Sequence, residues 1–237
     1  MTRPMTQMNS LLLAAAMMLA AAPALAQKIY EPPPARDLGG VWMIEGDRST
    51  LTTVEGKLPP MNKAARAKYN AALKARAAGK PDFDTVEKCM PHGLPRLLLA
   101  AYPIEVLQEP TQITFIHEAQ HMPRMVYLDA TLPPIADIDP LWMGFSAGKW
   151  DGDTLVVESG GFRDRTTLDK AGLPHSTAMK LSERIRKVDA DTLEDVFTVE
   201  DPAAYTKPWT ARVTYRRKPG YRLKEYVCTA FNPEATK

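Results

Sequence analysis

The sequence predicts one mainly-β domain that closes into an antiparallel, up-and-down barrel of about nine or ten strands. From residue 104 onward, most of the chain consists of short β-prone runs in which apolar and polar residues alternate. Turn residues separate these runs at short intervals, and short links favour antiparallel pairing. The strongest hairpin signal is Asp151-Gly152 between two such runs. A β-sandwich is the alternative architecture.

The first 26 residues predict a signal peptide rather than part of the fold. Arg3 gives a basic start, residues 11–22 an apolar run, and Ala24-Leu25-Ala26 a small-residue cleavage site. The apolar run is about a dozen residues long, whereas a bilayer span needs about 20. We therefore expect a periplasmic protein cleaved after Ala26, with a single barrel domain over 27–237. An uncleaved membrane anchor is the alternative.

The mature chain begins with a proline-rich extended segment, and Gly40-Val41-Trp42 then opens the first strand. Residues 60–79 predict the one helix, with Pro60 near its first turn and Gly79 beyond its end. Its apolar face is thin, so we expect it on the outer surface of the barrel. Further strands are expected at 104–108, 111–118, 124–129, 143–150, 154–158, 178–188, 192–200, 210–217 and 221–228.

The composition argues against nucleic acid as the main partner. The formal net charge is only +2, whereas phosphate binding requires a basic stripe. Basic residues do cluster at 212–218, but alternation places most of them on one face of a strand, which favours a solvated outer surface.

The chain has two cysteines, Cys89 and Cys228. In an oxidising compartment an even pair favours a disulfide. Such a bond would tie the end of the chain to the segment after the helix and contribute about 4 kcal/mol through loop closure. Two free buried thiols are the alternative.

Strand alternation predicts which polar side chains point into the barrel. His117 shares a strand face with Ile113 and Phe115, and Glu183 shares one with Leu181 and Ile185. By the same rule Asp195 and Glu225 also face inward. A carboxylate in apolar surroundings has a raised pKa unless it is paired, which suits general acid or base work.

Glu183 is the predicted catalytic acid or base, with His175 as its proton partner and Asp164 as the residue that orients His175. His175 and Asp164 lie in the loop 163–176, which is long for a hairpin connection and so is typical of a functional loop. The alternative for Glu183 is an internal ion pair with Arg184, Arg186 or Arg212. The alternative for His175 is a hydrogen bond to its own loop backbone.

The predicted substrate-binding residues are His117, Phe115, Tyr205, Trp209 and Glu225, which would line the pocket. No metal site is predicted: His117 and His121 share a strand face but would lie ~13 Å apart. No dinucleotide, phosphate-loop or nucleophile-elbow pattern occurs. We therefore expect no cofactor.

Several runs resemble a broad family of secreted, mostly uncharacterised bacterial lipocalin-like proteins. They are W-D-G-D-T-L-V-V-E-S-G-G-F (150–162), P-H-S (174–176), E-R-I-R-K-V-D-A-D-T-L-E (183–194), D-P-A-A-Y-T-K-P-W (201–209) and E-Y-V-C (225–228). The G-x-W at 40–42 is also similar to the start of lipocalin-like barrels. The resemblance implies a small exported barrel that carries both cysteine positions, and it implies no reaction or catalytic residue.

These features lead to a first hypothesis of an exported, cofactor-independent lyase, dehydratase or isomerase. Its substrate would be a small apolar or aromatic molecule in the barrel cavity, for example a plant- or lignin-derived phenolic dimer. The second hypothesis is a non-catalytic periplasmic carrier of an apolar small molecule. A structural or envelope-interaction protein with paired inner charges is the third. Stable membrane insertion is not expected.

Overall fold

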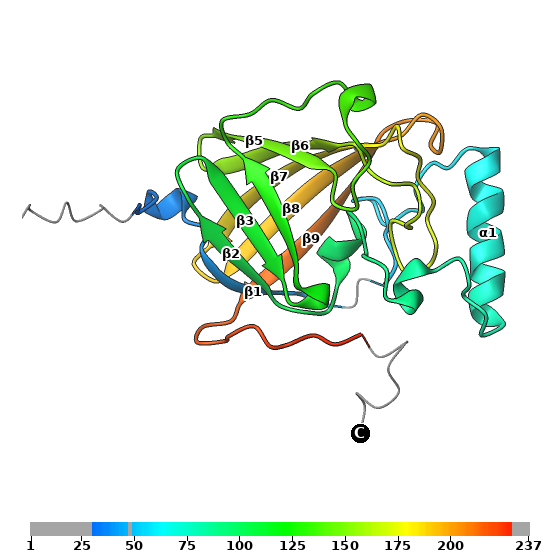
Figure 1. The fold of residues 1–237 in the computed structure, drawn as a ribbon, viewed down its shortest axis with the longest axis horizontal. Helices are drawn as coiled ribbons and strands as arrows, with labels where there is room; N and C mark the ends of the chain where they lie inside the picture. The colour runs from blue at the N-terminus through cyan, green and yellow to red at the C-terminus, as the bar shows by residue number, and fades with distance from the viewer. Residues whose placement is uncertain (1–29, 47–48, 229–237) are drawn as a thin grey trace, which may run out of the picture.

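The computed structural model describes residues 30–46 and 49–228, which form a closed barrel of nine strands in chain order, with β1 pairing to β9 (Figure 1). The mainly-β, closed barrel with one helix is therefore confirmed. The predicted signal peptide (1–26) lies outside the described residues. The strands are β1 (Gly40–Ile44), β2 (Ile104–Gln108), β3 (Gln112–His117), β4 (Met122–Tyr127), β5 (Phe145–Asp151), β6 (Thr154–Gly160), β7 (Lys180–Asp189), β8 (Thr192–Glu200) and β9 (Trp209–Arg217).

The Asp151-Gly152 signal does form a hairpin. Asp151 of β5 pairs with Thr154 of β6, and Gly152 at the turn has a φ of +57°. That left-handed conformation is one that glycine adopts without the steric cost met by other residues. The two strands then stay in register as far as Phe145 and Gly160.

One strand pair departs from the antiparallel prediction. β4 and β5 run parallel and meet through a single residue pair, Tyr127 with Ala147, whereas every other pair of named strands is antiparallel. Between them, residues 128–144 form a long irregular connection in place of a tight turn. The chain thus re-enters the sheet in the same direction, and the barrel is mixed.

The prediction of a last strand at 221–228 is wrong. This segment runs as an extended tail below the barrel and pairs with no strand of residues 30–46 and 49–228 (Figure 1). The barrel is already closed by β1 and β9, which pair through Trp42 and Arg217, Met43 and Arg216, and Ile44 and Tyr215. The tail is instead held by side chains: the Glu118 carboxylate accepts from Tyr221 Oη at 3.0 Å and from Lys224 N at 2.8 Å.

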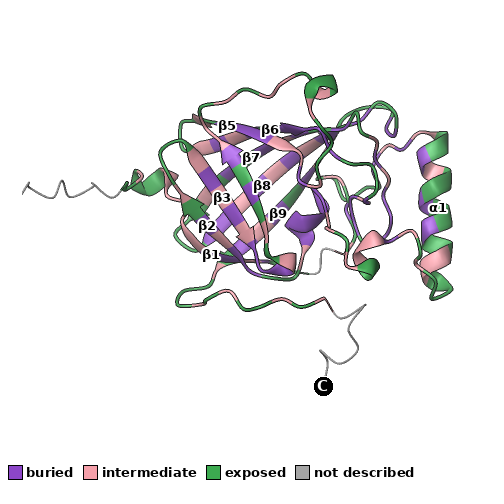
Figure 2. Cartoon of the chain, in the orientation of Figure 1, coloured by how far each residue is buried: buried purple, intermediate pink, exposed green. Residues whose placement is uncertain are grey.

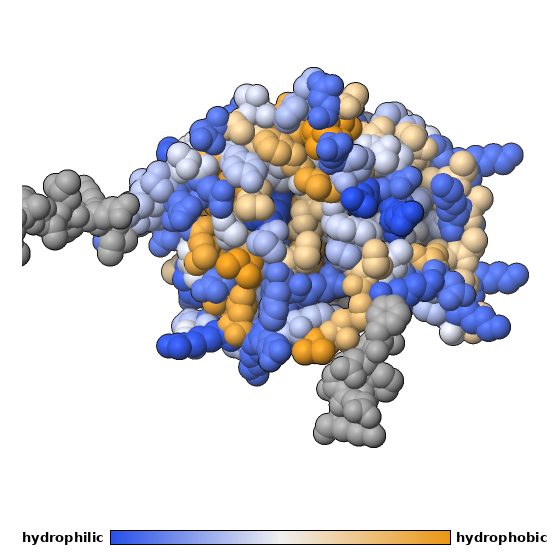
Figure 3. All heavy atoms as spheres, in the orientation of Figure 1, coloured by the Kyte–Doolittle hydropathy of each residue, from blue (hydrophilic) through white to orange (hydrophobic). Residues whose placement is uncertain are grey.

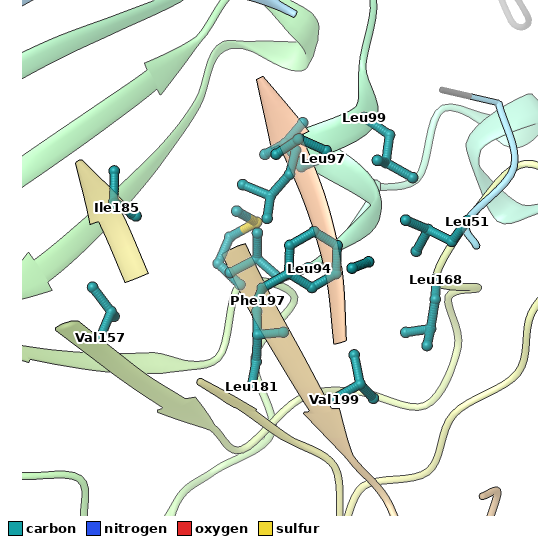
Figure 4. Close-up of a cluster of buried hydrophobic side chains, with 14 of the residues drawn as sticks. Leu51, Leu94, Leu97, Leu99, Val157, Leu168, Leu181, Ile185, Phe197 and Val199 are labelled. Atoms are coloured by element: carbon teal, nitrogen blue, oxygen red, sulfur yellow. The ribbon is translucent and has the colours of Figure 1, made fainter. Parts of the chain in front are cut away.

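The barrel is filled with side chains. Buried and exposed positions alternate along the strands (Figure 2), as the period of two requires. Leu94, Leu97 and Leu99 close one end, where they meet Leu51, Leu168 and strand residues such as Phe197 (Figure 4).

The helix α1 (Lys63–Ala77) stands beside the closed end of the barrel (Figure 1). Asn62 caps it, accepting from Ala65 N at 2.9 Å. The buried carboxylate of Asp84 then links α1 to the turn Arg96–Leu99, whose leucines close the end of the barrel. It accepts from Arg76 Nη2 of α1 at 2.6 Å and from Arg96 Nη1 and Nη2 at 2.6 and 2.8 Å. α1 is thereby fixed relative to the barrel.

The predicted disulfide between Cys89 and Cys228 is present, and it joins positions 139 residues apart. A disulfide is consistent with an exported protein. Within residues 30–46 and 49–228, no helix is long and apolar enough to cross a bilayer. Apolar side chains form only small groups among mostly hydrophilic ones on the face drawn in Figure 3.

Candidate functional site

Glu183 lies in the barrel interior and is completely buried, as alternation predicts. Its carboxylate is bound by Arg124 of β4: Nη1 donates to Oε1 at 2.7 Å, and Nη2 donates to Oε2. Ser146 and Ser159 lie against the same guanidinium, with Ser159 Oγ 3.1 Å from Nη2. The predicted partners of Glu183 were wrong: Arg184 pairs with Asp151, and Arg186 and Arg212 pair with Glu194 on the outside. The inward carboxylate is therefore one half of an internal ion pair.

Asp195 lies next to this pair. Burial and the neighbouring Glu183 carboxylate raise its pKa well above the ordinary value, and its Oδ1 atom has no hydrogen-bond partner in the described part of the chain. Asp195 and Arg124 border an interior cavity with a volume of only about 20 Å³. A cavity of that size holds about one water molecule, so it cannot take a small organic molecule.

His117 and Phe115 also face the interior, and they are 1% and 6% exposed. Burial, with the charge of Arg124 adding to it, lowers the pKa of His117 to about 3. The imidazole is therefore neutral, and neither of its ring nitrogens has a hydrogen-bond partner among the residues that the structure describes. Phe115 borders the small cavity, and the Arg124 guanidinium lies 5.8 Å from the centre of its ring. These two predicted pocket residues belong to the core.

One hollow large enough for a small ligand lies outside the barrel, between α1 and the loop 163–176. This hollow, here called the α1 groove, has a volume of about 500 Å³. Small and apolar side chains form much of its wall, and polar and charged side chains supply the rest. The lining residues are Lys68, Ala71, Ala72, Ala75, Lys80, Asp82, Phe83, Asp164, Arg165, Thr166, Thr167, Gly172, Pro174 and His175.

The loop 163–176 forms one wall of the α1 groove because Asp169 organises it from within. The buried Asp169 carboxylate accepts from the backbone nitrogens of Gly172 and Leu173 at 2.9 and 3.0 Å, and from that of Leu51 at 2.9 Å. Gly172 then packs so closely on α1 that a Cβ there would lie 2.5 Å from Ala72 Cβ. The loop is thus held against the helix.

His175 is in the α1 groove and is 7% exposed. Its Nδ1 lies 3.2 Å from the Ser176 carbonyl oxygen, so Nδ1 carries the proton and donates it. Nε2 is then free to accept, and Thr166 Oγ1 donates to it at 2.8 Å. Burial lowers the pKa of His175 although the charges of Asp201 and Asp164 oppose this. The ring is therefore neutral near pH 7. The predicted bond between His175 and its own loop backbone is also present.

Asp164 is exposed and borders the α1 groove with His175, so the structure brings this predicted pair together. The residue that fixes the local backbone is Asp201 instead. Its carboxylate accepts from Ser176 N at 2.6 Å and from Ser176 Oγ at 2.8 Å. Asp201 thereby positions the carbonyl that orients His175.

The other predicted pocket residues are scattered. Tyr205 is buried, and its Oη donates to the Pro174 carbonyl at 2.8 Å, supporting the loop from below. Trp209 packs edge-on against Tyr205 and borders a separate surface hollow of about 630 Å³. Glu225 is exposed on the tail, because the strand that was expected to turn it inward does not form.

No group of three or more His, Cys, Asp or Glu side chains in the described part of the chain could hold a metal ion. His121 lies at the surface, with Nε2 2.8 Å from the Lys224 carbonyl oxygen, and so helps to hold the tail.

Sequence reasoning missed Arg124, Thr166 and Asp201. Arg124 shares a face of a predicted strand with Val126, so its inward direction could have been predicted from the alternation. Thr166 carries no comparable signal, because its contact with His175 depends on the folding of an irregular loop.

Comparison of the chain with protein-family models and with curated proteins gave no match. The functional assignment therefore rests on the residues and their geometry.

Proposed function

We propose that this protein is exported and binds a small, largely apolar or aromatic molecule in the α1 groove. The observation that carries the proposal is the lining of this groove, in which Ala71, Ala75 and Phe83 provide apolar surface beside the polar pair Thr166 and His175. Ligand sites are commonly mostly apolar hollows of 300–1,000 Å³ with a few placed polar groups. The disulfide and the predicted signal peptide support export to the periplasm.

A ligand inside the barrel, as in a lipocalin-like carrier, finds little support. The interior space beside Asp195 is about 20 Å³, which is far below the volume of an aromatic ring with substituents. We keep the relation to lipocalin-like barrels as a proposal about ancestry, and we assign the ligand to the outer groove.

The second candidate function is cofactor-independent proton transfer in the same groove, as in a lyase, dehydratase or isomerase. It is favoured by the neutral imidazole of His175, which lies in the groove beside Asp164. In this form of the hypothesis His175 is the base. Glu183 has no part in it, because its carboxylate is bound to Arg124 in the interior.

The test is a thermal-shift screen of aromatic and lipid-like compounds, followed by calorimetric titration of each hit. Ala75→Leu should fill the groove and weaken binding at least tenfold, which corresponds to about 1.4 kcal/mol. Ala67→Leu is the matched control, because Ala67 is exposed on the same helix but does not line the groove. Equal affinities of the two variants, or a screen in which nothing stabilises the protein, would refute the proposal.

A further inference from the structure

We propose that Thr166 is a nucleophile, with His175 as its base, and that the α1 groove hydrolyses esters of small apolar or aromatic acids. This inference rests on the proposed function, since the groove must first bind the acyl group.

The first support is the arrangement of donors and acceptors. An activated hydroxyl needs a base within hydrogen-bond reach and a third group that orients the base. Thr166 Oγ1 lies 2.8 Å from His175 Nε2, and His175 Nδ1 lies 3.2 Å from the Ser176 carbonyl oxygen. Because the carbonyl can only accept, the tautomer with a free lone pair on Nε2 is the one that faces the hydroxyl.

The second support is the rigidity behind this pair. Asp201 is only 2% exposed, and its carboxylate accepts hydrogen bonds from both the backbone nitrogen and the hydroxyl of Ser176. Asp201 is a positioning residue, because it acts on His175 through Ser176. On the other side, Gly93 leaves room for Thr166: a Cβ at Gly93 would lie 2.9 Å from Thr166 Oγ1.

The third support is the surroundings of the hydroxyl. Thr166 and His175 both line the groove, next to Phe83 and Pro174, which offer apolar surface to an acyl chain or ring. Three cationic side chains, Lys68, Lys80 and Arg165, border the same hollow and outnumber its two carboxylates, Asp82 and Asp164. Positive charge there favours the anionic tetrahedral intermediate of acyl transfer.

The reaction balances with ester and water as the only reactants. Thr166 Oγ1 attacks the ester carbonyl carbon while its proton passes to His175 Nε2. The bond from that carbon to the alkoxy oxygen then breaks, and the leaving alcohol takes the proton from Nε2. Water, deprotonated by the same nitrogen, next attacks the acyl-threonine, and Oγ1 recovers its proton as the acid leaves.

The experiment measures hydrolysis of p-nitrophenyl butyrate by the full chain and locates the acyl group by mass spectrometry of peptides after rapid quenching. We expect butyryl on Thr166. Thr166→Val, which is nearly isosteric, should lose at least about 100-fold in rate, while Thr166→Ser should retain activity within about tenfold. Thr198→Val is the matched control, because its hydroxyl pairs with Thr210 on the outer face of the barrel at 2.8 Å. It should leave the rate unchanged.

The pH dependence of the hydrolysis rate tests the role of Asp201, because a residue with a purely structural role would not change it. Asp201→Asn removes a negative charge near His175, so the pH at which the rate reaches half its plateau should shift downward. An unchanged pH profile would count against the positioning role.

Failure of this inference can be told from failure of the proposed function. If aromatic compounds bind the groove but no ester is cleaved, or if Thr166→Val cleaves esters as fast as the original protein, the nucleophile is refuted and the binding site stands. If neither binding nor cleavage is seen, both fail. Should Thr166→Val fold poorly, the labelled peptide and Thr166→Ser decide the question.

Discussion

Arg124 of β4 binds both carboxylate oxygens of Glu183 of β7 inside the barrel, and the two residues lie on strands that are not neighbours in the sheet. The guanidinium is 1% exposed and the carboxylate 0%. A buried pair of this kind contributes little net stability compared with apolar residues of the same volume. Breaking it is costly, however, because one charge is left buried without its partner.

Glu183→Gln should therefore act on stability. We expect the free energy of unfolding at pH 7 to fall by about 3–5 kcal/mol, as measured by urea denaturation. Glu225→Gln, on the exposed tail, is the control and should change it by no more than about 0.5 kcal/mol. A loss below about 1 kcal/mol for Glu183→Gln would contradict the structural role.

Asp195→Asn should be tolerated, because burial and the Glu183 carboxylate raise the pKa of Asp195 and so favour its neutral form. Its pKa is raised in the folded state, so the folded protein binds more protons than the unfolded chain. Stability from this group is complete below the unfolded pKa of about 3.9 and is lost as the pH rises through the folded value. Unfolding titrations from pH 4 upward should show a decline for the original protein that the variant lacks.

Asp84 should show the opposite dependence on pH. Burial alone would raise its pKa, but hydrogen bonds and charge from Arg96, and a hydrogen bond from Arg76, lower it overall. Its contribution is therefore complete above about pH 4 and is lost as the pH falls through the lowered folded value. Asp84→Asn should cost about 3 kcal/mol at pH 7, and the difference should shrink in acid. A constant difference between pH 7 and pH 2 would rule out this explanation.

Gly172→Ala should loosen the loop from α1. Gly172 has a φ of +99°, and an added Cβ would meet Ala72 Cβ at 2.5 Å and Phe83 Cε2 at 2.9 Å. Gly220→Ala is the matched control, since Gly220 also has a positive φ (+71°) but no atom of the described residues lies within 4 Å of the added Cβ. Both variants should lose about 1 kcal/mol from the backbone, and only Gly172→Ala should also weaken ligand binding in the groove. Equal binding by both would show that the groove does not need this contact.

Replacing both Cys89 and Cys228 by alanine should lower the free energy of unfolding by about 4–5 kcal/mol, because a loop of 139 residues is released in the unfolded chain. Denaturant unfolding of the original protein with and without reductant measures the same quantity. The double variant should be indifferent to reductant. If reductant destabilises the variant equally, the effect does not come from this disulfide.

Much of the barrel could be predicted because strand alternation is a local signal. It identified the inward direction of His117, Glu183 and Asp195, and all three are buried. It could not identify Arg124 as the partner of Glu183, because contacts across the interior depend on how the sheet closes. Nor could it show that 221–228 has no strand partner, since that segment alternates like a strand but finds the barrel already closed by β1 and β9.

The candidate site was predicted less well for a related reason. The loop 163–176 was predicted to be functional from its length, and its residues His175 and Asp164 both border the α1 groove. The pairing of His175 with Thr166, and its support by Asp201 through Ser176, depend on backbone turns that have no periodic sequence signal.

The parallel contact between β4 and β5 is the seam at which the barrel wall is held by the fewest paired residues. Along this line Tyr127 and Ala147 form the one ladder pair, and the stacked rings of Tyr127 and Phe145, 5.4 Å apart, reinforce it from the side. Few backbone hydrogen bonds have to break there for β4 and β5 to separate. Transient opening of the barrel should therefore begin at the seam between β4 and β5. Amide hydrogens beside this seam should exchange with solvent well before those of β7 and β8, whose ladder runs from Lys180 and Glu200 to Asp189 and Thr192.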